Sequence, residues 1–160
     1  MHSQTAGDAV TADVSSGFSQ LRELRDRIGA HLAAAIDVRT RTLRAVSLDA
    51  ALLGDYVQSF TAGGKRLRGA FVVAGWLGTG RDINDAVFDA AAAVELLHAC
   101  ALLHDDIMDA SDLRRGQPSA HRWFEGHHES QLWSGDGALF GLGAAILAGD
   151  LCLCWADELL

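Results

Sequence analysis

The sequence contains few cysteines and has no excess of basic residues. Cys100, Cys152 and Cys154 are an odd number in apolar surroundings, which favours reduced thiols of an intracellular protein over disulfides. Among the 160 residues, 21 are acidic and 13 are Lys or Arg, so the formal net charge is −8. This negative charge disfavours nucleic acid and anionic membrane surfaces as partners.

Long hydrophobic runs and targeting signals are also missing. No stretch of eighteen apolar residues is free of charge, and residues 1–8 lack the basic and apolar regions of a signal peptide. We therefore expect a cytoplasmic protein without a transmembrane segment. The apolar content of 49% is enough for the core of one domain, which is also the number expected from the chain length.

Apolar residues recur at helical spacing, and no alternating strand pattern bounded by turns is found. Residues 1–17 are small, polar and acidic and are predicted to form a flexible tail. Helices are expected from Phe18 onward, over residues 48–60, 65–77 and 85–109, and from about residue 136 to 160. We therefore predict an all-α fold, in which residues 18–160 form part of one helical domain.

Three acids, Asp105, Asp106 and Asp109, gather at the end of a predicted helix. Asp105 and Asp109 share one face, with Asp106 beside them, although like charges at this spacing repel each other. Acidic runs are often only solvated surfaces, but residues 90–103 before these acids are almost all apolar. A cation would offset the repulsion, and Mg²⁺ is bound by carboxylates together with substrate phosphates.

Two basic clusters accompany the acids. Arg114 and Arg115 follow shortly after them, and a planar guanidinium can bind phosphate oxygens through two hydrogen bonds. Lys65 and Arg68 follow the glycine pair 63–64, where exposed N–H groups and the helix dipole favour an anion. Alone, this second pattern is more often an ordinary basic helix start. Together with the acids it indicates two phosphate sites, one with metal and one without.

Three histidines are candidate ligands. His98 lies seven residues before Asp105, so two helical turns place both residues on one face. A single histidine in an apolar helix is more often a core residue, but the face of His98 leads to the acids, and an imidazole can donate to phosphate. His127 and His128 are predicted to lie in a polar loop as surface residues rather than as Zn²⁺ ligands.

The motifs, in this order, resemble those of the trans-isoprenyl diphosphate synthases, also called polyprenyl synthetases. The resemblance runs from about Gly63 to Leu160 and rests on four motifs. These are Gly-Gly-Lys-Arg-Leu-Arg, Glu-Leu-Leu-His ahead of the acids, the acids followed by Arg-Arg-Gly-x-Pro-x-x-His, and Gly149-Asp150. The acid motif lacks the two-residue insertion typical of bacterial farnesyl diphosphate synthases and looks like that of a geranylgeranyl diphosphate synthase.

The resemblance implies an isoprenoid-synthase helical bundle, a reaction and a set of roles. Mg²⁺ would assist ionisation of an allylic diphosphate, and isopentenyl diphosphate would attack the resulting cation. The metal would be held by Asp105, Asp106 and Asp109. These acids and Arg114, which contacts the allylic diphosphate, would form the catalytic set. Isopentenyl diphosphate would be bound by Lys65, Arg68, His98 and Arg115. The complete protein would be a homodimer.

Two departures from the family pattern bear on function. Gly69 stands where the family usually has proline. The second aspartate-rich motif of the family, with a further lysine, is not found, so the chain resembles the N-terminal half only and is expected to be a truncated form, inactive alone. Two other functions stay open: a non-catalytic partner subunit, and a fragment of a class I terpene cyclase. The two basic clusters argue against a cyclase, which binds no second diphosphate.

The residues before the acids also predict the product. In the family, the residues four and five positions before the first aspartate shape the floor of the pocket, and here they are Ala101 and Cys100. Both are small, so the growing prenyl chain is not stopped early. We therefore expect a product of C20 or longer.

Overall fold

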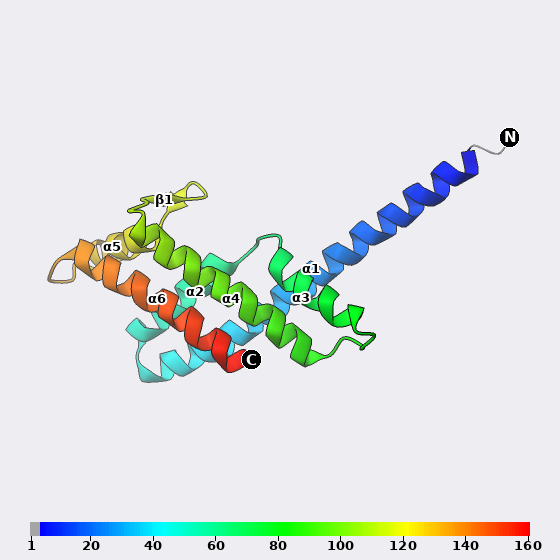
Figure 1. The fold of residues 1–160 in the computed structure, drawn as a ribbon. Coiled ribbons are helices and arrows are strands. Elements are labelled where there is room, and N and C mark those ends of the chain that lie inside the picture. The colour runs from blue at the N-terminus through cyan, green and yellow to red at the C-terminus, as the bar shows by residue number, and fades with distance from the viewer. Residues whose placement is uncertain (1–3) are drawn as a thin grey trace.

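The structure, a computed structural model, describes the backbone of residues 4–160 (Figure 1). Solvent exposure and side-chain contacts are described for residue 17 and for residues 19–160. Within this part of the chain it contains six helices and one two-stranded sheet. In chain order they are α1 (Gln4–Val46), α2 (Leu48–Thr61), α3 (Leu67–Gly78), α4 (Asp85–Met108), β1 (Leu113–Arg114), β2 (Gln117–Pro118), α5 (Ala120–Ser130) and α6 (Gly137–Leu159). The predicted all-α fold is confirmed.

The first helix starts earlier than the sequence pattern predicted. It was expected from Phe18, whereas α1 begins at Gln4 and so covers most of the predicted tail. Residues 1–3 of that tail lie outside the described residues, and its flexibility stays a prediction. In Figure 1 the N-terminal part of α1 extends away from the other helices. Its second half contacts the end of α6, where Arg39 Nε donates to Glu158 Oε2 at 2.9 Å.

The prediction missed α5. Residues 120–130 are helical, so the placement of His127 and His128 in a polar loop is wrong. His128 is buried and packs against Trp133 and Phe140. Three residues of α5 are buried, and only two of them, Ala120 and Phe124, are apolar. The apolar periodicity that predicts a helix is therefore weak in this segment.

Helix α4 lies at the centre of the packing, against α6, α3 and α1. Leu96 and Leu103 of α4 are fully buried in the main core, together with Phe124 of α5 and Cys152 of α6. Removing these side chains from water is the main stabilising term of such a core. The packing therefore fixes the helix that carries His98 and the three acids.

Two helices of the described chain, α4 and α6, are long and apolar enough to cross a membrane by length and composition alone. Their most apolar stretches are 50% and 33% buried, respectively. Helices in the core of a soluble protein meet the same criteria. The absence of a transmembrane segment therefore stays a prediction.

Candidate functional site

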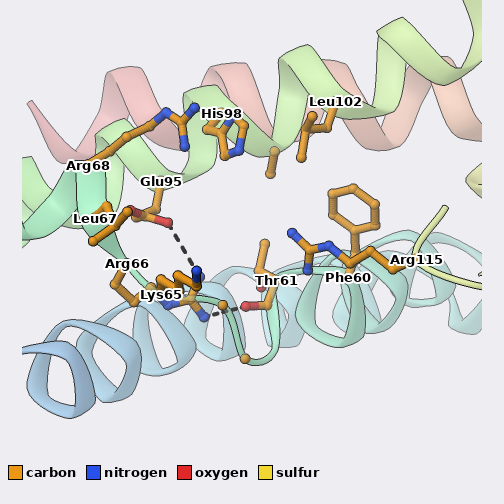
Figure 2. Close-up of a pocket in the computed structure, with 13 residues that line it drawn as sticks. Phe60, Thr61, Lys65, Arg66, Leu67, Arg68, Glu95, His98, Leu102 and Arg115 are labelled. Carbon is orange, nitrogen blue, oxygen red and sulfur yellow. Dashed lines mark hydrogen bonds and ion pairs between the residues drawn. The ribbon is translucent and has the colours of Figure 1, made fainter. Parts of the chain in front are cut away.

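A cavity of about 430 Å³ lies between the loop before α3, the middle of α4 and the β1–β2 turn (Figure 2). Lys65, Arg68, His98 and Arg115 all line it. These four residues come from three separate segments of the chain, and they are the four that the family resemblance assigned to isopentenyl diphosphate. The fold therefore brings them together around one space.

The loop before α3 turns through two glycines. Gly63 and Gly64 have φ values of +78° and +86°. Residues with a Cβ rarely adopt this backbone conformation. Helix α3 begins only at Leu67, so Lys65 is not helical. The helix predicted from residue 65 therefore starts two residues later, and Lys65 and Arg68 both line the cavity.

One of the cations that line the cavity, Arg66, is paired with an acid. Arg66 lies 3.5 Å from Glu95 through its Nη1, and its Nη2 donates to the carbonyl of Thr61. Within the part of the chain that the structure describes, no ion pair is found for Lys65, Arg68 or Arg115. Three unpaired cations around one cavity favour a ligand with several negative charges.

The surroundings of His98 lower its pKa and so favour the neutral imidazole. Burial lowers its pKa below the usual value of 6.5, and the positive charges of Arg68, Arg115 and Arg114 lower it further, whereas Glu95 acts in the opposite direction. A neutral imidazole has one N–H to donate and one nitrogen that accepts. His98 can therefore donate one hydrogen bond to an anion in the cavity at neutral pH.

The three acids at the end of α4 have different environments. Asp105 is exposed, with 59% of its side chain accessible, and Asp109 is also exposed. Asp106 is only 2% exposed, and its carboxylate accepts from Arg114 Nε at 2.5 Å and from Nη2 at 2.7 Å. The hydrogen bond to Asp106 raises the pKa of Arg114. Asp106 therefore faces an arginine, and its place in a metal site stays a prediction.

Asp105 and Asp109 fit a hard divalent cation. Mg²⁺ commonly takes one or two protein carboxylates, and completes its shell with water and substrate phosphates. In residues 17 and 19–160 no three His, Cys, Asp or Glu side chains converge as ligands of one ion. The two exposed acids would therefore hold a cation only together with oxygens from a ligand or from water.

The β1–β2 hairpin presents one arginine to each region. Arg115 and Gly116 form its turn with φ values of +52° and +77°, as a type I′ turn requires at both central positions. Arg114, in β1, reaches Asp106 and lies 3.8 Å from Asp105, whereas Arg115 lines the cavity. The hairpin therefore joins the acid cluster to the cavity.

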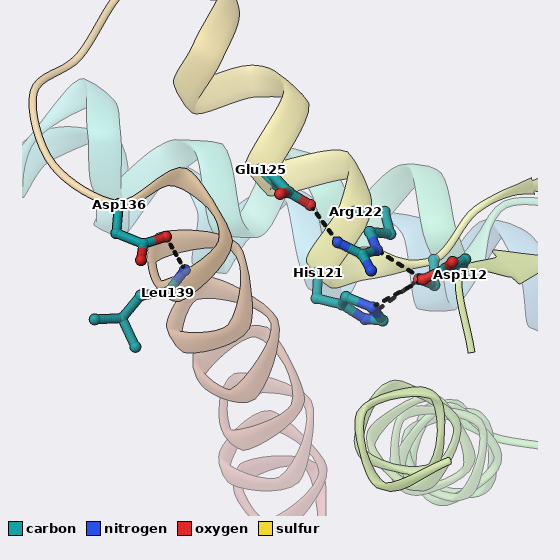
Figure 3. A network of polar contacts seen from close by, with 7 residues as sticks. Asp112, His121, Arg122, Glu125, Asp136 and Leu139 are labelled. Carbon is teal, nitrogen blue, oxygen red and sulfur yellow. Dashed lines mark hydrogen bonds and ion pairs between the residues drawn. The ribbon is translucent and has the colours of Figure 1, made fainter. Parts of the chain in front are cut away.

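The hairpin is fastened to α5 (Figure 3). Arg122 donates to Asp112 at 2.7 Å and to Glu125 at 2.8 Å, and the backbone N–H of Ser119 donates to the carbonyl of Asp112. His121, from the motif that follows the acids, lies 4.0 Å from Asp112. These contacts hold both ends of the hairpin and so help to place its two arginines.

Sequence reasoning missed two residues near Arg114 and Arg115. Tyr56 and Trp123 line a second cavity, of about 300 Å³, together with Arg114 and Arg115. Burial, with a further contribution from the negative charge of Asp106, raises the pKa of Tyr56 to about 12. The hydroxyl therefore stays protonated at neutral pH. The only signal in the sequence is that Tyr56 is the single tyrosine.

A sequence model of the family described as polyprenyl synthetase matches residues 50–160. The chain belongs to the polyprenyl synthetase family. This confirms the family that the four motifs indicated.

Individual relatives agree with this assignment. The geranylgeranyl diphosphate synthase of Methanosarcina mazei is 41% identical over 100 residues, which are 62% of this chain and 25% of that protein. The nonaprenyl diphosphate synthase of Mycobacterium tuberculosis is 34% identical over 155 residues, which are 96% of this chain and 36% of that protein. The chain thus spans well under half of the length of these relatives.

A solved structure shares the fold. The crystal structure of a geranylgeranyl pyrophosphate synthase from Corynebacterium glutamicum, complexed with isoprenyl diphosphate and magnesium, matches with a TM-score of 0.81 and 36% identity. The match covers 88% of this chain and 41% of that chain.

Proposed function

We propose that this chain carries the diphosphate-binding residues of a prenyltransferase that condenses isopentenyl diphosphate with an allylic diphosphate. One observation carries the proposal. Among the described residues, three cations without an ion pair line one cavity together with His98. Two exposed acids, Asp105 and Asp109, lie at the end of α4, where Arg114 contacts Asp106 and lies 3.8 Å from Asp105. Two differently built regions suit two diphosphates.

The cavity is assigned to isopentenyl diphosphate. Lys65, Arg68 and Arg115 offset the charge of its diphosphate, and His98 donates a hydrogen bond to it. This region needs no metal, because protein cations alone supply the positive charge. A terpene cyclase would have no use for such a second site, so the cavity favours a prenyltransferase over that alternative.

The acids are assigned to the allylic diphosphate. Asp105 and Asp109 would hold Mg²⁺, which when bound stabilises the negative charge of the leaving diphosphate. Arg114 contacts the same diphosphate from the hairpin. Asp106 holds Arg114 in place through two hydrogen bonds, so its role is to position the arginine.

We further propose a cytoplasmic protein that forms a homodimer when complete. All three cysteines are free thiols, which suits a reducing compartment. Leu139, Leu147 and Leu153 of α6 are 68%, 54% and 48% exposed. Large exposed apolar side chains on one helix mark interaction surfaces, and a second copy related by a two-fold axis is the commonest partner.

The titration of His98 tests the assignment of the cavity. In the 160-residue chain, the pKa of His98 is expected below 6.5 and is expected to rise when inorganic diphosphate is added without metal, because the anion stabilises the imidazolium. Binding should therefore take up a proton and strengthen as the pH falls through this range. Proton NMR of the histidine rings measures both values. An unchanged pKa of His98 would contradict the assignment.

We propose a product of C20 or longer. Ala101 and Leu97 lie one and two turns before Asp105, and both are exposed along this side of α4. Cys100, beside them, is only half-buried. No bulky aromatic side chain of this turn blocks a prenyl chain that extends from the acids along the helix.

Phenylalanine at Ala101 or Cys100 should shorten the product, because it fills the space that the growing chain needs. The assay would use residues 1–160 fused to the remaining part of the Corynebacterium glutamicum synthase, with product lengths measured by chromatography. The control Ala86→Phe adds the same side chain at an exposed position near the other end of α4 and should leave the product unchanged. A main wild-type product of C15, or no shift in either variant, would refute this pocket assignment.

A further inference from the structure

Glu95 occupies an unexpected place in the wall of the cavity. It is 8% exposed, and among the described residues it is the one acid that lines a cavity whose other lining residues include four cations, Lys65, Arg66, Arg68 and Arg115. A carboxylate so close to a bound diphosphate repels it. Its contacts supply another role. Glu95 accepts a hydrogen bond from the backbone N–H of Gly69 at 3.0 Å. Figure 2 shows its second contact, with Arg66 at 3.5 Å.

The first contact completes the start of α3. The N-terminal N–H groups of a helix have no partner within the helix, and a side chain at the N-cap usually accepts from one of them. In α3 the N-cap is Arg66, which is left-handed with φ +50° and makes no side-chain capping bond. Glu95 of α4 accepts from Gly69, the third helical residue, so another helix supplies the missing cap. A carboxylate there also suits the positive end of the helix dipole.

Glycine at position 69 makes this contact possible. A Cβ on Gly69 would meet Ile28 Cγ2 at 3.0 Å and the carbonyl oxygen of Ala91 at 3.3 Å, so the absence of a side chain lets α3 lie close to α4. A proline, which the family resemblance leads one to expect here, would have no N–H to donate.

We propose that Glu95 is a positioning residue: by capping α3 through Gly69 and pairing with Arg66, it fixes the loop of residues 63–66 and the start of α3 relative to His98. His98 lies three residues after Glu95 on the same helix, so one rigid element carries both the ligand and the tether. Arg66 is thereby an internal partner, which leaves the flanking Lys65 and Arg68 for the diphosphate. This inference rests on the proposed function in one respect: its binding test requires that the cavity binds diphosphate.

Two roles for Glu95 predict opposite results. If Glu95 were only a nearby charge, its neutralisation would remove repulsion and strengthen the binding of an anion. If it is the tether, neutralisation frees Arg66 and the loop, and binding weakens. The glutamine variant Glu95→Gln separates the roles, because it removes the charge but keeps an oxygen that can accept from Gly69.

The test measures the Kd of inorganic diphosphate, without metal, for the 160-residue chain and its variants. Glu95→Gln and Arg66→Gln are each expected to weaken binding about tenfold, the order of loss typical when a group that supports a ligand is removed. The double variant should be no weaker than the weaker single variant, because both changes break one contact. Unchanged or tighter binding by Glu95→Gln, or losses that add, would overturn the proposal.

A matched ion pair controls for the loss of charge. Arg44 Nη2 donates to both oxygens of Asp55 at 2.8 Å, and both side chains are exposed. Arg44→Gln and Asp55→Asn make the same kind of change away from the cavity and should leave the Kd unchanged.

Two readouts do not depend on the proposed function. The Gly69 amide should exchange slowly with solvent in the wild type and in Glu95→Gln, and faster in Glu95→Ala, which removes the acceptor. The pKa of His98 should fall further in Glu95→Gln, because Glu95 raises it. If the wild-type chain bound no diphosphate, the proposed function would fail while these readouts still tested the tether. Equal exchange of Gly69 in all three proteins would refute the cap.

Discussion

Replacing Asp105 by asparagine is expected to lower the rate of prenyl transfer by about two to four orders of magnitude. The change removes one of two exposed carboxylates that would hold the divalent cation, whose stabilisation of the leaving diphosphate is worth several kcal/mol, and each 1.36 kcal/mol corresponds to a factor of about ten. The rate would be measured with the fusion to the Corynebacterium glutamicum synthase, because the chain spans 41% of that protein. Asp109→Asn should behave in the same way.

The control for this experiment lies on the same helix. Asp85 is exposed and lies in the first turn of α4. Asp105 lies near the opposite end of this helix. Asp85→Asn makes the same chemical change and should leave the rate near that of the unmodified fusion. Rates of Asp105→Asn equal to those of the control would show that this acid holds no catalytic metal.

Replacing Arg114 by leucine is expected to destabilise the fold by about 3 kcal/mol, because it leaves a buried carboxylate without its partner. The carboxylate is that of Asp106, which is 2% exposed and accepts two hydrogen bonds from Arg114. Urea unfolding of the 160-residue chain measures the free energy of unfolding at neutral pH.

Two further variants make the test specific. The double variant Arg114→Leu with Asp106→Leu should recover part of the lost stability, because no charge is then buried alone. Arg122→Leu removes a guanidinium that also bonds two acids, Asp112 and Glu125, but at the exposed surface, and should have a much smaller effect. If Arg114→Leu were no worse than Arg122→Leu, the buried pair would not be a main support of the hairpin.

The sequence predicted those parts of the site that depend on local spacing or on motifs. Asp105 and Asp109 are one turn apart on any helix, so their common exposure followed from periodicity. The meeting of Lys65, His98 and Arg115 did not follow from spacing, because they lie on three segments. It was anticipated only through the resemblance to a known family.

The remaining features depend on tertiary contacts that the sequence does not display. Glu95 accepts from the N–H of Gly69, which is 26 residues away in the chain. The left-handed backbone of Arg66, close to this contact, is likewise not visible in the sequence. Asp106 looks like its two neighbouring acids in sequence, and only its burial against Arg114 distinguishes it. Helix α5 was not predicted because its buried face includes the polar residue His128. The apolar residues of α5 therefore do not recur with a clear helical period.

The most direct test of the account is the calorimetric titration of isopentenyl diphosphate into the 160-residue chain in the presence of a metal chelator. One molecule of isopentenyl diphosphate is expected to bind per chain without metal. This binding should be lost in the double variant Lys65→Met with Arg68→Met and retained in Asp105→Asn. Binding that required Mg²⁺ and Asp105 but was indifferent to Lys65 and Arg68 would contradict the account.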